Sequence, residues 1–228
     1  MKAIILAAGL GSRLARVTKN KPKSLIKIGN QTILKRLILQ LESCGVKDIN
    51  IICGYKKKKI DHQFPGYKTF FYPNYNKTNN LHTLYYFRKL LDDDCLILFA
   101  DIILDKIIIK KLVASNKKIV LCIDKSKSRE GTMKVDLVKD KLKYLGNFPK
   151  INSGNYIGIM KIKKKYIDLL IKAMKNIKNN SNNLYFTESI NYIISNRLAK
   201  INHLDVNKKF WIEIDDNKDL ALAKKKFK

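Results

Sequence analysis

The stretch LAAGLGSRL, Leu6–Leu14, decides how the rest of the chain is interpreted. It follows a short apolar run, Ala3–Leu6, that is typical of a buried first strand. It precedes the segment NKPKSLIKIGNQTIL, Asn20–Leu34. A strand that leads into a glycine-rich loop favours an α/β fold. The loop lacks the third glycine of a dinucleotide fingerprint and the Gly-Lys-Ser/Thr of a P-loop, so it matches neither motif.

The same loop carries groups that suit phosphate. Gly9 and Gly11 let the backbone approach a ligand closely and present N–H groups to phosphate oxygens. Arg13 adds a guanidinium fork and Lys23 a point charge, and Pro22 stiffens the segment that delivers Lys23. A Gly-x-Gly pair alone recurs in many turns. The pair followed by an arginine and then by Pro-Lys is more specific, and it predicts a phosphate-binding site.

Short apolar strands alternate with amphipathic helices, which favours an α/β fold with a mainly parallel sheet. The predicted strands are Ala3–Leu6, Ile49–Cys53, Lys68–Tyr72, Cys95–Ala100, Ile119–Ile123, Asn155–Ile162, Lys200–Leu204 and residues 210–215. The predicted helices cover residues 32–44, 80–91 with Asn80 as the N-cap, 106–114, 166–175, 187–195 and the C-terminal residues. An antiparallel hairpin within residues 133–145 breaks the alternation. We therefore expect one domain, 1–228, with a small inserted β lobe at about 125–155.

The charge of the chain is high, because 47 Lys+Arg against 19 Asp+Glu give a formal net charge of +28. One interpretation is a non-catalytic nucleic-acid-binding protein. The other is a solvated surface set by base composition, since 41 Lys, 31 Ile and 21 Asn, all with AT-rich codons, far outnumber 6 Arg. Nucleic-acid readers favour Arg. We expect no specific nucleic-acid partner, and we interpret clusters such as Lys161–Lys165 as exposed surface.

The sequence gives no support for a membrane protein or for a metal site built from histidines or cysteines. No apolar run approaches the roughly 20 residues of a membrane helix, so no membrane insertion is expected. The short N-terminal apolar run is interpreted as a strand rather than a signal peptide. The three histidines show no metal-ligand spacing. The cysteines lie in apolar surroundings without Cys-x-x-Cys spacing, which predicts buried thiols and a cytoplasmic protein: Cys44, Cys53, Cys95 and Cys122.

The pattern LAAGLGSR…KPKSL resembles the signature L-A-A-G-x-G-[ST]-R…P-K of the nucleotidyltransferase superfamily. These enzymes transfer a nucleotidyl group from an NTP to a phosphorylated small molecule and release pyrophosphate. The resemblance implies a single-domain, Rossmann-like, three-layer α/β/α fold with a mixed sheet. It also implies that Gly9, Gly11, Ser12 and Arg13 hold the triphosphate. Lys23, together with Arg13, is then catalytic at the reacting α-phosphate.

Acidic residues at two strand ends are candidate Mg²⁺ ligands. Asp101 closes a hydrophobic strand, where open α/β sheets place ligand groups, and a carboxylate there suits Mg²⁺. In the late strand WIEID, alternation puts Trp211, Glu213 and Asp215 on one face. This arrangement resembles that of the superfamily, in which an acidic residue late in the chain is the second metal ligand. We expect Asp101 and Asp215 to bind the metal, Glu213 to bind metal or acceptor, and Asp216 to cap the last helix.

Two segments are candidates for recognition of the nucleobase. One is CGY, Cys53–Tyr55, which follows the second strand and contributes Gly54 and Tyr55. The other is TNNLHT, Thr78–Thr83, which opens a helix and contributes Asn79, Asn80 and Thr83. Amide side chains can read the edge of a pyrimidine; the alternative is that these are turn and cap residues only. The complete predicted nucleotide-binding set is Leu6, Ala7, Ala8, Gly9, Gly11, Ser12, Arg13, Gly54, Tyr55, Asn79, Asn80 and Thr83.

Within the superfamily the chain is most similar to the CTP:phosphocholine cytidylyltransferase-type branch, through KPKSL, YNKTNNLHTL and WIEIDD. The predicted acceptor-binding residues on the side of the inserted lobe are Trp211, Glu213, Asn155, Tyr156 and Glu188. Asn155 stands where an acidic residue is expected in the phosphocholine type, which weakens the case for a quaternary ammonium acceptor. Tyr156, Tyr185, Phe186 and Trp211 form an aromatic cage or pack in the core. Glu188 contacts the acceptor, or Thr187 begins a capping box.

The sequence thus predicts a cytoplasmic, Mg²⁺-dependent cytidylyltransferase that joins CTP to a phosphorylated small polar molecule such as phosphocholine or a phosphonate. Such a product would feed the synthesis of a surface glycan or lipid. The enzymatic alternative is a sugar-1-phosphate or polyol-phosphate nucleotidyltransferase that uses UTP, GTP or dTTP. The alternative of another class is the nucleic-acid-binding protein. A homodimer is compatible with all of these interpretations.

Overall fold

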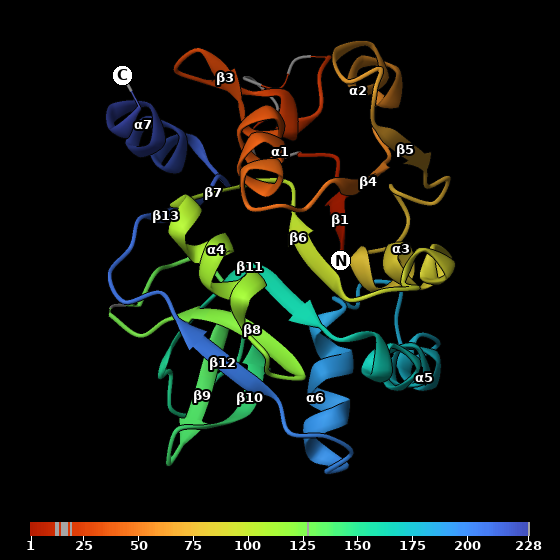
Figure 1. Ribbon diagram of the computed structural model, residues 1–228, viewed down its shortest axis with the longest axis vertical. Coiled ribbons are helices and arrows are strands. Elements are labelled where there is room, and N and C mark those ends of the chain that lie inside the picture. Colours follow the sequence, from red (N-terminus) through yellow and green to blue (C-terminus); the bar gives the residue numbers. More distant parts are fainter. Residues whose placement is uncertain (12–13, 15–17, 19, 127, 228) are drawn as a thin grey trace.

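A nine-stranded mixed sheet forms the centre of the protein in the computed structural model (Figure 1). The structure describes residues 1–11, 14, 18, 20–126 and 128–227. The strand order is β10-β9-β11-β6-β1-β4-β5, and β8 pairs with both β11 and β12. In chain order the strands are β1 (Lys2–Ala7), β4 (Asp48–Cys53), β5 (Lys68–Phe71), β6 (Cys95–Phe99), β8 (Ile119–Asp124), β9 (Lys134–Val138), β10 (Lys141–Gly146), β11 (Gly154–Ile162) and β12 (Asn202–Asp205).

Helices cover both faces of this sheet, which confirms the predicted α/β class. They are α1 (Ile33–Ser43), α2 (Lys57–Gln63), α3 (Asn80–Tyr86), α4 (Lys106–Ala114), α5 (Ile167–Ile177), α6 (Thr187–Ser195) and α7 (Asn217–Lys226). Helix α1 contacts α4, whereas α3, α5 and α6 contact one another as a separate group. Short 3₁₀ turns are η2 (Lys23–Leu25), η3 (Arg88–Leu90) and η4 (Lys164–Tyr166). No helix in the described ranges is long and apolar enough to cross a membrane.

Helix α1 shows why the predicted elements form where they do. Its buried residues follow a single stripe: Ile33, Leu34, Leu37, Ile38 and Leu41. The hydroxyl of Thr32 accepts a hydrogen bond from the Lys35 N–H at 3.2 Å and caps the first turn. The stripe therefore packs on the sheet while the polar face stays in solvent. The predicted bounds of most elements differ from the observed ones by one or two residues.

The predicted helix over residues 80–91 is the largest error. Its N-cap is Asn79 rather than Asn80, since Asn79 Oδ1 accepts a hydrogen bond from the Asn80 N–H at 2.8 Å. The α-helix ends at Tyr86, and η3 follows as a separate turn. Asn80 instead uses its own Oδ1 to accept a hydrogen bond from the Phe186 N–H at 2.7 Å.

Four strands of the sheet, β5-β4-β1-β6, run parallel to their neighbours. Their carboxyl ends meet at the same edge, so the residues that follow β1, β4 and β6 come together there. Beyond β6, strand β11 pairs antiparallel with β6, β8 and β9. The predicted hairpin forms as β9 and β10, and it joins the edge of the main sheet through Gly154 and Asn155 of β11.

Two small sheets lie outside the main one. Strands β7 (Ile102–Leu104) and β13 (Trp211–Glu213) pair antiparallel, and β2 (Lys27–Ile28) pairs with β3 (Gln31–Thr32). Their apolar side chains form a second core cluster, which includes Leu14, Ile28, Ile103, Ile212, Ile214 and Leu220. This cluster ties α7 to the N-terminal segment, and it underlies the acidic residues described next.

Candidate active site

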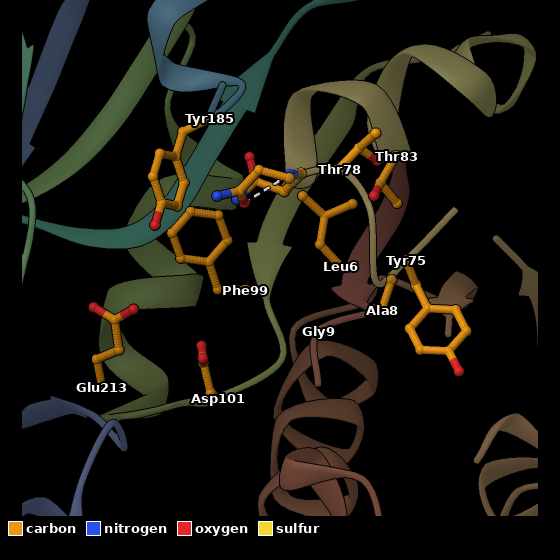
Figure 2. Close-up of a pocket in the computed structure, with 12 residues that line it drawn as sticks. Leu6, Ala8, Gly9, Tyr75, Thr78, Thr83, Phe99, Asp101, Tyr185 and Glu213 are labelled. Atoms are coloured by element: carbon orange, nitrogen blue, oxygen red, sulfur yellow. Dashed lines mark hydrogen bonds between the residues drawn. The ribbon is translucent and has the colours of Figure 1, made fainter. Parts of the chain in front are cut away.

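A cavity of about 190 Å³ opens at the carboxyl edge of β1 and β6 (Figure 2). The predicted nucleotide-binding residues in its lining are Leu6, Ala8, Gly9, Asn79, Asn80 and Thr83. Figure 2 shows Tyr185 and Glu213 on one side and Thr78 and Thr83 on the other. A smaller hollow of about 100 Å³ shares Leu6, Gly9 and Asp101 with it and adds Ala7, Gly11 and Lys23. The two hollows meet at Asp101.

The beginning of α3 is joined to a distant segment. The Asn79 N–H donates to the carbonyl of Asn182 at 2.8 Å, and the Leu81 N–H donates to that of Leu184 at 3.2 Å. Together with the bond from Phe186 to Asn80, these contacts fix residues 182–186 beside the first turn of α3. Tyr185 is thereby held against the cavity.

Three carboxylates converge at the junction of the two hollows. Asp101 follows β6, and β13 pairs with β7 so that Glu213 lies opposite Ile102. The Ile214 N–H donates to the Asp101 carbonyl at 2.9 Å, which continues this pairing. One carboxylate oxygen each from Asp101, Glu213 and Asp215 lies within 4.8 Å of the others. Because Ile212 and Ile214 are buried in the second core cluster, alternation turns Glu213 and Asp215 toward Asp101, as the sequence predicts.

Lys23 bridges two of these acids. Its Nζ donates to Asp101 Oδ2 at 2.8 Å and to Asp215 Oδ1 at 2.7 Å. Burial alone would lower the pKa of Lys23, but the attraction of Asp101 and Asp215 outweighs it and raises the pKa well above its usual value. The ammonium therefore stays charged at neutral pH. Gly11, at φ +66°, leaves room for the Lys23 side chain, since a Cβ on residue 11 would lie 3.1 Å from Lys23 Cβ.

The acidic cluster meets the requirements of a divalent metal site. Hard cations such as Mg²⁺ take carboxylate oxygens together with phosphate oxygens and water. The Oδ1 atom of Asp101 is buried and has no hydrogen-bond partner among the described residues. A buried carboxylate oxygen without a partner is unfavourable unless a ligand satisfies it. Asp101, Asp215 and Glu213 thus fit a divalent cation.

Comparison with known proteins assigns the chain to a family. A family model for the MobA-like NTP transferase domain matches residues 3–148. The chain belongs to this family. The CTP:phosphoglutamine cytidylyltransferase of Campylobacter jejuni is 27% identical over 97% of this chain and 98% of that protein. The choline-phosphate cytidylyltransferase of Streptococcus pneumoniae is 40% identical over 40% of this chain and 41% of that protein.

Solved structures of nucleotidyltransferases have the same fold as this chain. The CTP:phosphocholine cytidylyltransferase from Streptococcus pneumoniae superposes with a TM-score of 0.82 at 22% identity, covering 100% of this chain and 99% of that one. The predicted membership of the nucleotidyltransferase superfamily and the Rossmann-like architecture are both confirmed. The chain is a nucleotidyltransferase with relatives of the cytidylyltransferase type.

Two of the predicted nucleotide-binding residues lie outside the cavity lining. Neither Gly54 nor Tyr55 belongs to the cavity lining formed by the described residues. A Cβ on Gly54 would lie 2.4 Å from the Ala8 carbonyl oxygen and 2.4 Å from Tyr75 Cβ. Gly54 thus supports the cavity wall from behind. Tyr55 is half-buried, with the Lys56 ammonium 5.7 Å from its ring centroid.

The predicted acceptor-binding residues are only partly brought together. Glu213 lines the cavity, whereas Tyr156 is only 1% exposed and packs against Phe99 in the core. Trp211 donates from Nε1 to Asp124 Oδ2 at 2.7 Å and lines a separate hollow. Asn155 is fully buried and binds neighbouring loop residues. Asn155 and Tyr156 are buried, and the Trp211 indole is held by Asp124 beside another hollow, so none of the three belongs to the cavity lining formed by the described residues.

Two further predictions concern α6. Glu188 Oε2 accepts a hydrogen bond from Asn191 Nδ2 at 3.2 Å and is outside the described cavity lining. The N-cap of α6 is Phe186, so the alternative interpretation, a capping box that begins at Thr187, is wrong. Phe186 is buried, which also removes it from the expected aromatic cage. Of the four cage candidates, Tyr185 alone lines the cavity as described.

The remaining predictions concern Ser12 and Arg13, which lie outside the described residues. Their phosphate-binding roles stay predictions. Conversely, the cavity includes Tyr75 and Phe99, which the sequence analysis did not single out, and Thr78, which belongs to the candidate segment Thr78–Thr83 but not to the predicted set. A signal for Phe99 was present, since a residue two before Asp101 points to the same face of an extended segment.

Proposed function

We propose that this nucleotidyltransferase moves a cytidylyl group from CTP to the phosphate of a small polar molecule and releases pyrophosphate. The observation that carries this proposal is the position of Lys23. Its ammonium bridges Asp101 and Asp215 where the smaller hollow meets the cavity. A cation fixed there is suited to neutralise charge at a reacting phosphorus atom.

The two hollows suit two parts of a nucleotide. In the smaller one, backbone N–H groups near Gly9 and Gly11 face the triphosphate together with Lys23. In the larger one, Leu6 and Thr83 contact the base, and Asn79 and Asn80 present amide groups near it. The hydrogen bonds described above engage the Oδ1 atoms of both asparagines. Their NH₂ groups are donors that suit the carbonyl oxygen and N3 of cytosine, and the cytidylyltransferase relatives support this base.

A divalent cation, Mg²⁺ in our proposal, would be held by Asp101 and Asp215, with Glu213 as a third ligand or as a contact to the acceptor. When bound, it would neutralise negative charge on the phosphate oxygens. Asp101 and Asp215 also orient Lys23, because they accept both of its short hydrogen bonds.

The acceptor enters from the side of Tyr185 and Glu213, opposite Thr78 and Thr83 (Figure 2). A phosphate oxygen of the acceptor attacks the α-phosphorus in line. The new P–O bond forms while the bond to the bridging oxygen breaks, and pyrophosphate leaves with the electron pair. The attacking oxygen is already anionic, so positioning and charge neutralisation replace a strong base.

A pyrophosphate-release assay tests this proposal. Purified protein is incubated with Mg²⁺, each of CTP, UTP, GTP and dTTP, and one acceptor at a time: phosphocholine, aminoethylphosphonate, glutamine phosphate or a sugar 1-phosphate. We expect turnover with CTP and a small polar phosphate, loss with EDTA, and a loss of roughly 100-fold or more in Asp101→Asn. Asp168→Asn, which changes an exposed acid on α5, serves as the matched control.

Other results would contradict the proposal. Turnover only with UTP, GTP or dTTP and a sugar 1-phosphate would replace the cytidylyl assignment. An Asp101→Asn variant as active as Asp168→Asn would refute the metal role. Absence of turnover with every pair, together with retention on DNA or RNA that persists at physiological salt, would favour the nucleic-acid-binding alternative.

A further inference from the structure

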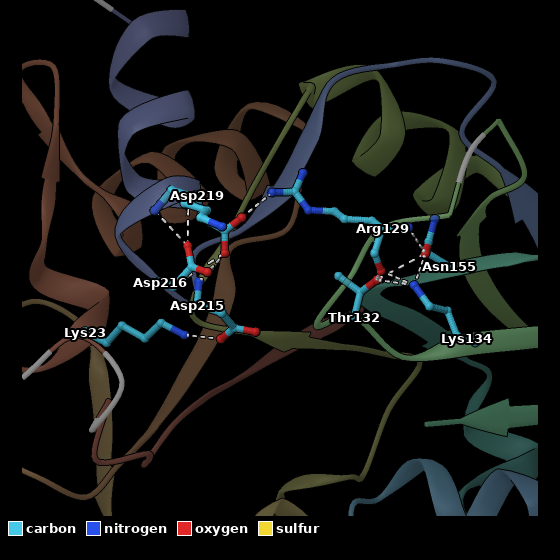
Figure 3. A network of polar contacts seen from close by, with 9 residues as sticks. Lys23, Arg129, Thr132, Lys134, Asn155, Asp215, Asp216 and Asp219 are labelled. Carbon is cyan, nitrogen blue, oxygen red and sulfur yellow. Dashed lines mark hydrogen bonds and ion pairs between the residues drawn. The ribbon is translucent and has the colours of Figure 1, made fainter. Parts of the chain in front are cut away.

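The loop before β9 has a fixed backbone. Asn155 is fully buried, and its Oδ1 accepts hydrogen bonds from the Arg129 N–H at 3.0 Å, from Thr132 Oγ1 at 3.1 Å and from Lys134 Nζ at 2.8 Å. The Arg129 carbonyl in turn accepts hydrogen bonds from Thr132 Oγ1 and Lys134 Nζ. Figure 3 shows these contacts around one turn of the chain. Asn155 therefore determines where the Arg129 side chain begins.

The Arg129 side chain leaves this loop and reaches α7 (Figure 3). Its Nη2 donates to Asp219 Oδ1 at 2.5 Å, and its guanidinium carbon lies 5.6 Å from the Trp211 ring centroid. Both partners of the ion pair are largely shielded from solvent, with 21% of the Arg129 side chain and 18% of the Asp219 side chain exposed. A shielded, hydrogen-bonded pair restrains its neighbours more than an exposed one does.

Asp219 connects Arg129 to the acidic cluster through hydrogen bonds to the backbone. Its second oxygen, Oδ2, accepts hydrogen bonds from the Asp215 N–H at 2.9 Å and from the Asp216 N–H at 3.3 Å. The Asp216 side chain accepts in return from the Asp219 N–H at 2.9 Å, which completes the capping box of α7. The backbone of Asp215 is thus fixed at the point from which its carboxylate reaches Lys23.

We propose that Arg129 is a positioning residue for the acidic cluster: through Asp219 it holds the Asp215 backbone so that the Asp215 carboxylate faces Asp101 and Lys23. The proposal rests on the proposed metal-dependent transfer, because it assigns Arg129 to the outer support of a metal ligand. It also joins residues 129–155 to the catalytic edge of the sheet, since the loop held by Asn155 supplies the guanidinium. Losing such outer support typically costs about 10- to 100-fold in metal affinity or activity.

The test uses the full chain with Arg129→Met, Arg129→Lys and Asp219→Asn. Lys2→Met is the matched control, because the Lys2 side chain is 11% exposed and forms an ion pair with Asp92 at 2.5 Å. Lys2 begins β1, whereas the cluster lies beyond the opposite end of this six-residue strand, about 20 Å away. Binding of Mn²⁺ by calorimetry, exchange of the Asp215 amide hydrogen by NMR, and kcat and KM are measured for each variant.

We expect Arg129→Met to weaken Mn²⁺ binding and lower kcat by about 10-fold or more, and to speed exchange of the Asp215 amide. Arg129→Lys should fall between Arg129→Met and wild type, since lysine keeps the charge but not the planar fork. The double variant Arg129→Met/Asp219→Asn should lose no more than the worse single variant, because both changes break the same pair. Lys2→Met should lower Tm without changing Mn²⁺ affinity.

The outcomes separate this inference from the proposed function. Wild-type Mn²⁺ affinity in Arg129→Met, beside an active wild type, overturns the positioning role alone, whatever happens to Tm. Additive losses in the double variant also overturn it. A wild-type protein that binds no Mn²⁺ and turns over no nucleotide overturns the proposed function, and the positioning role with it.

Discussion

Replacing Gly54 by alanine should displace the wall of the cavity in which we propose that the nucleotide binds, although Gly54 is not among the described residues that line it. The new Cβ would lie 2.4 Å from the Ala8 carbonyl oxygen and 2.4 Å from Tyr75 Cβ, whereas ordinary contact begins at 3.4 Å. The difference, 3.4 − 2.4, requires these neighbours to move by about 1 Å. Ala8 and Tyr75 both line the cavity, so the displacement should reach the nucleotide that we propose binds there.

The expected magnitudes follow from this 1 Å displacement. Forcing an extra methyl group into a packed region costs about 1–3 kcal/mol of the free energy of unfolding. A displacement of about 1 Å at a site of group transfer costs on the order of 100-fold in rate. Gly54→Ala should therefore unfold at lower urea concentration. It should also lose about 100-fold in kcat/KM for CTP, as measured by pyrophosphate release under saturating acceptor.

Gly66→Ala provides the control. A Cβ at Gly66 meets nothing within 4 Å, so this variant should keep wild-type activity and gain up to about 1 kcal/mol of stability. The reasoning fails if Gly54→Ala matches Gly66→Ala in both urea midpoint and kcat/KM for CTP. A CTP-induced thermal shift equal to that of wild type would contradict the displacement of the cavity wall in particular.

Three further predictions concern groups outside the cavity. Tyr156→Phe removes a buried hydroxyl that has no hydrogen-bond partner among the described residues, so urea unfolding should show stability unchanged or raised by about 1 kcal/mol, with kcat unchanged. In the native protein Cys44 should react with a thiol reagent much faster than the other cysteines, because burial raises the pKa of those three thiols; all four should react after unfolding. Burial would raise the pKa of Asp136, but three backbone N–H donors hold it below the ordinary 3.8. Its contribution to stability is therefore present above pH 3.8 and lost as pH falls further, and Asp136→Asn should flatten this part of the curve of urea midpoint against pH.

Local rules were sufficient to predict which residues meet at the carboxyl edge of the sheet. Strands that run parallel end at one edge, which brings the loop after β1 near Asp101 after β6. Alternation along the late strand places Glu213 and Asp215 on one face. Both rules depend only on neighbouring residues and on strand direction, and the structure brings one oxygen of each of these acids within 4.8 Å.

Long-range contacts determined what the sequence left open. Asn79 and Asn80 are equally good N-caps by residue type. The choice between them depends on Phe186, whose N–H binds Asn80 Oδ1 across a separation of 106 residues. Lys161 is a second residue whose place depends on long-range contacts. The sequence analysis interprets it as part of an exposed cluster, and that interpretation is wrong. Lys161 is only 3% exposed and donates from Nζ to the carbonyls of Val113, in the last turn of α4, and Ser115, just after this helix, at 2.7 Å each.

The acidic cluster differs in charge from the basic surface around it. The chain carries +28 overall, but Lys23, Asp101, Glu213 and Asp215 together carry one positive and three negative formal charges, so their sum, 1 − 3, is −2. In the proposed reaction a triphosphate and a phosphorylated acceptor both approach this cluster as anions, and the surface lysines are screened beyond about 8–10 Å. One divalent cation brings the formal sum to zero while Lys23 remains charged. The positive net charge of the whole protein steers anions to the surface. The local excess of two negative charges supports a metal-dependent transfer.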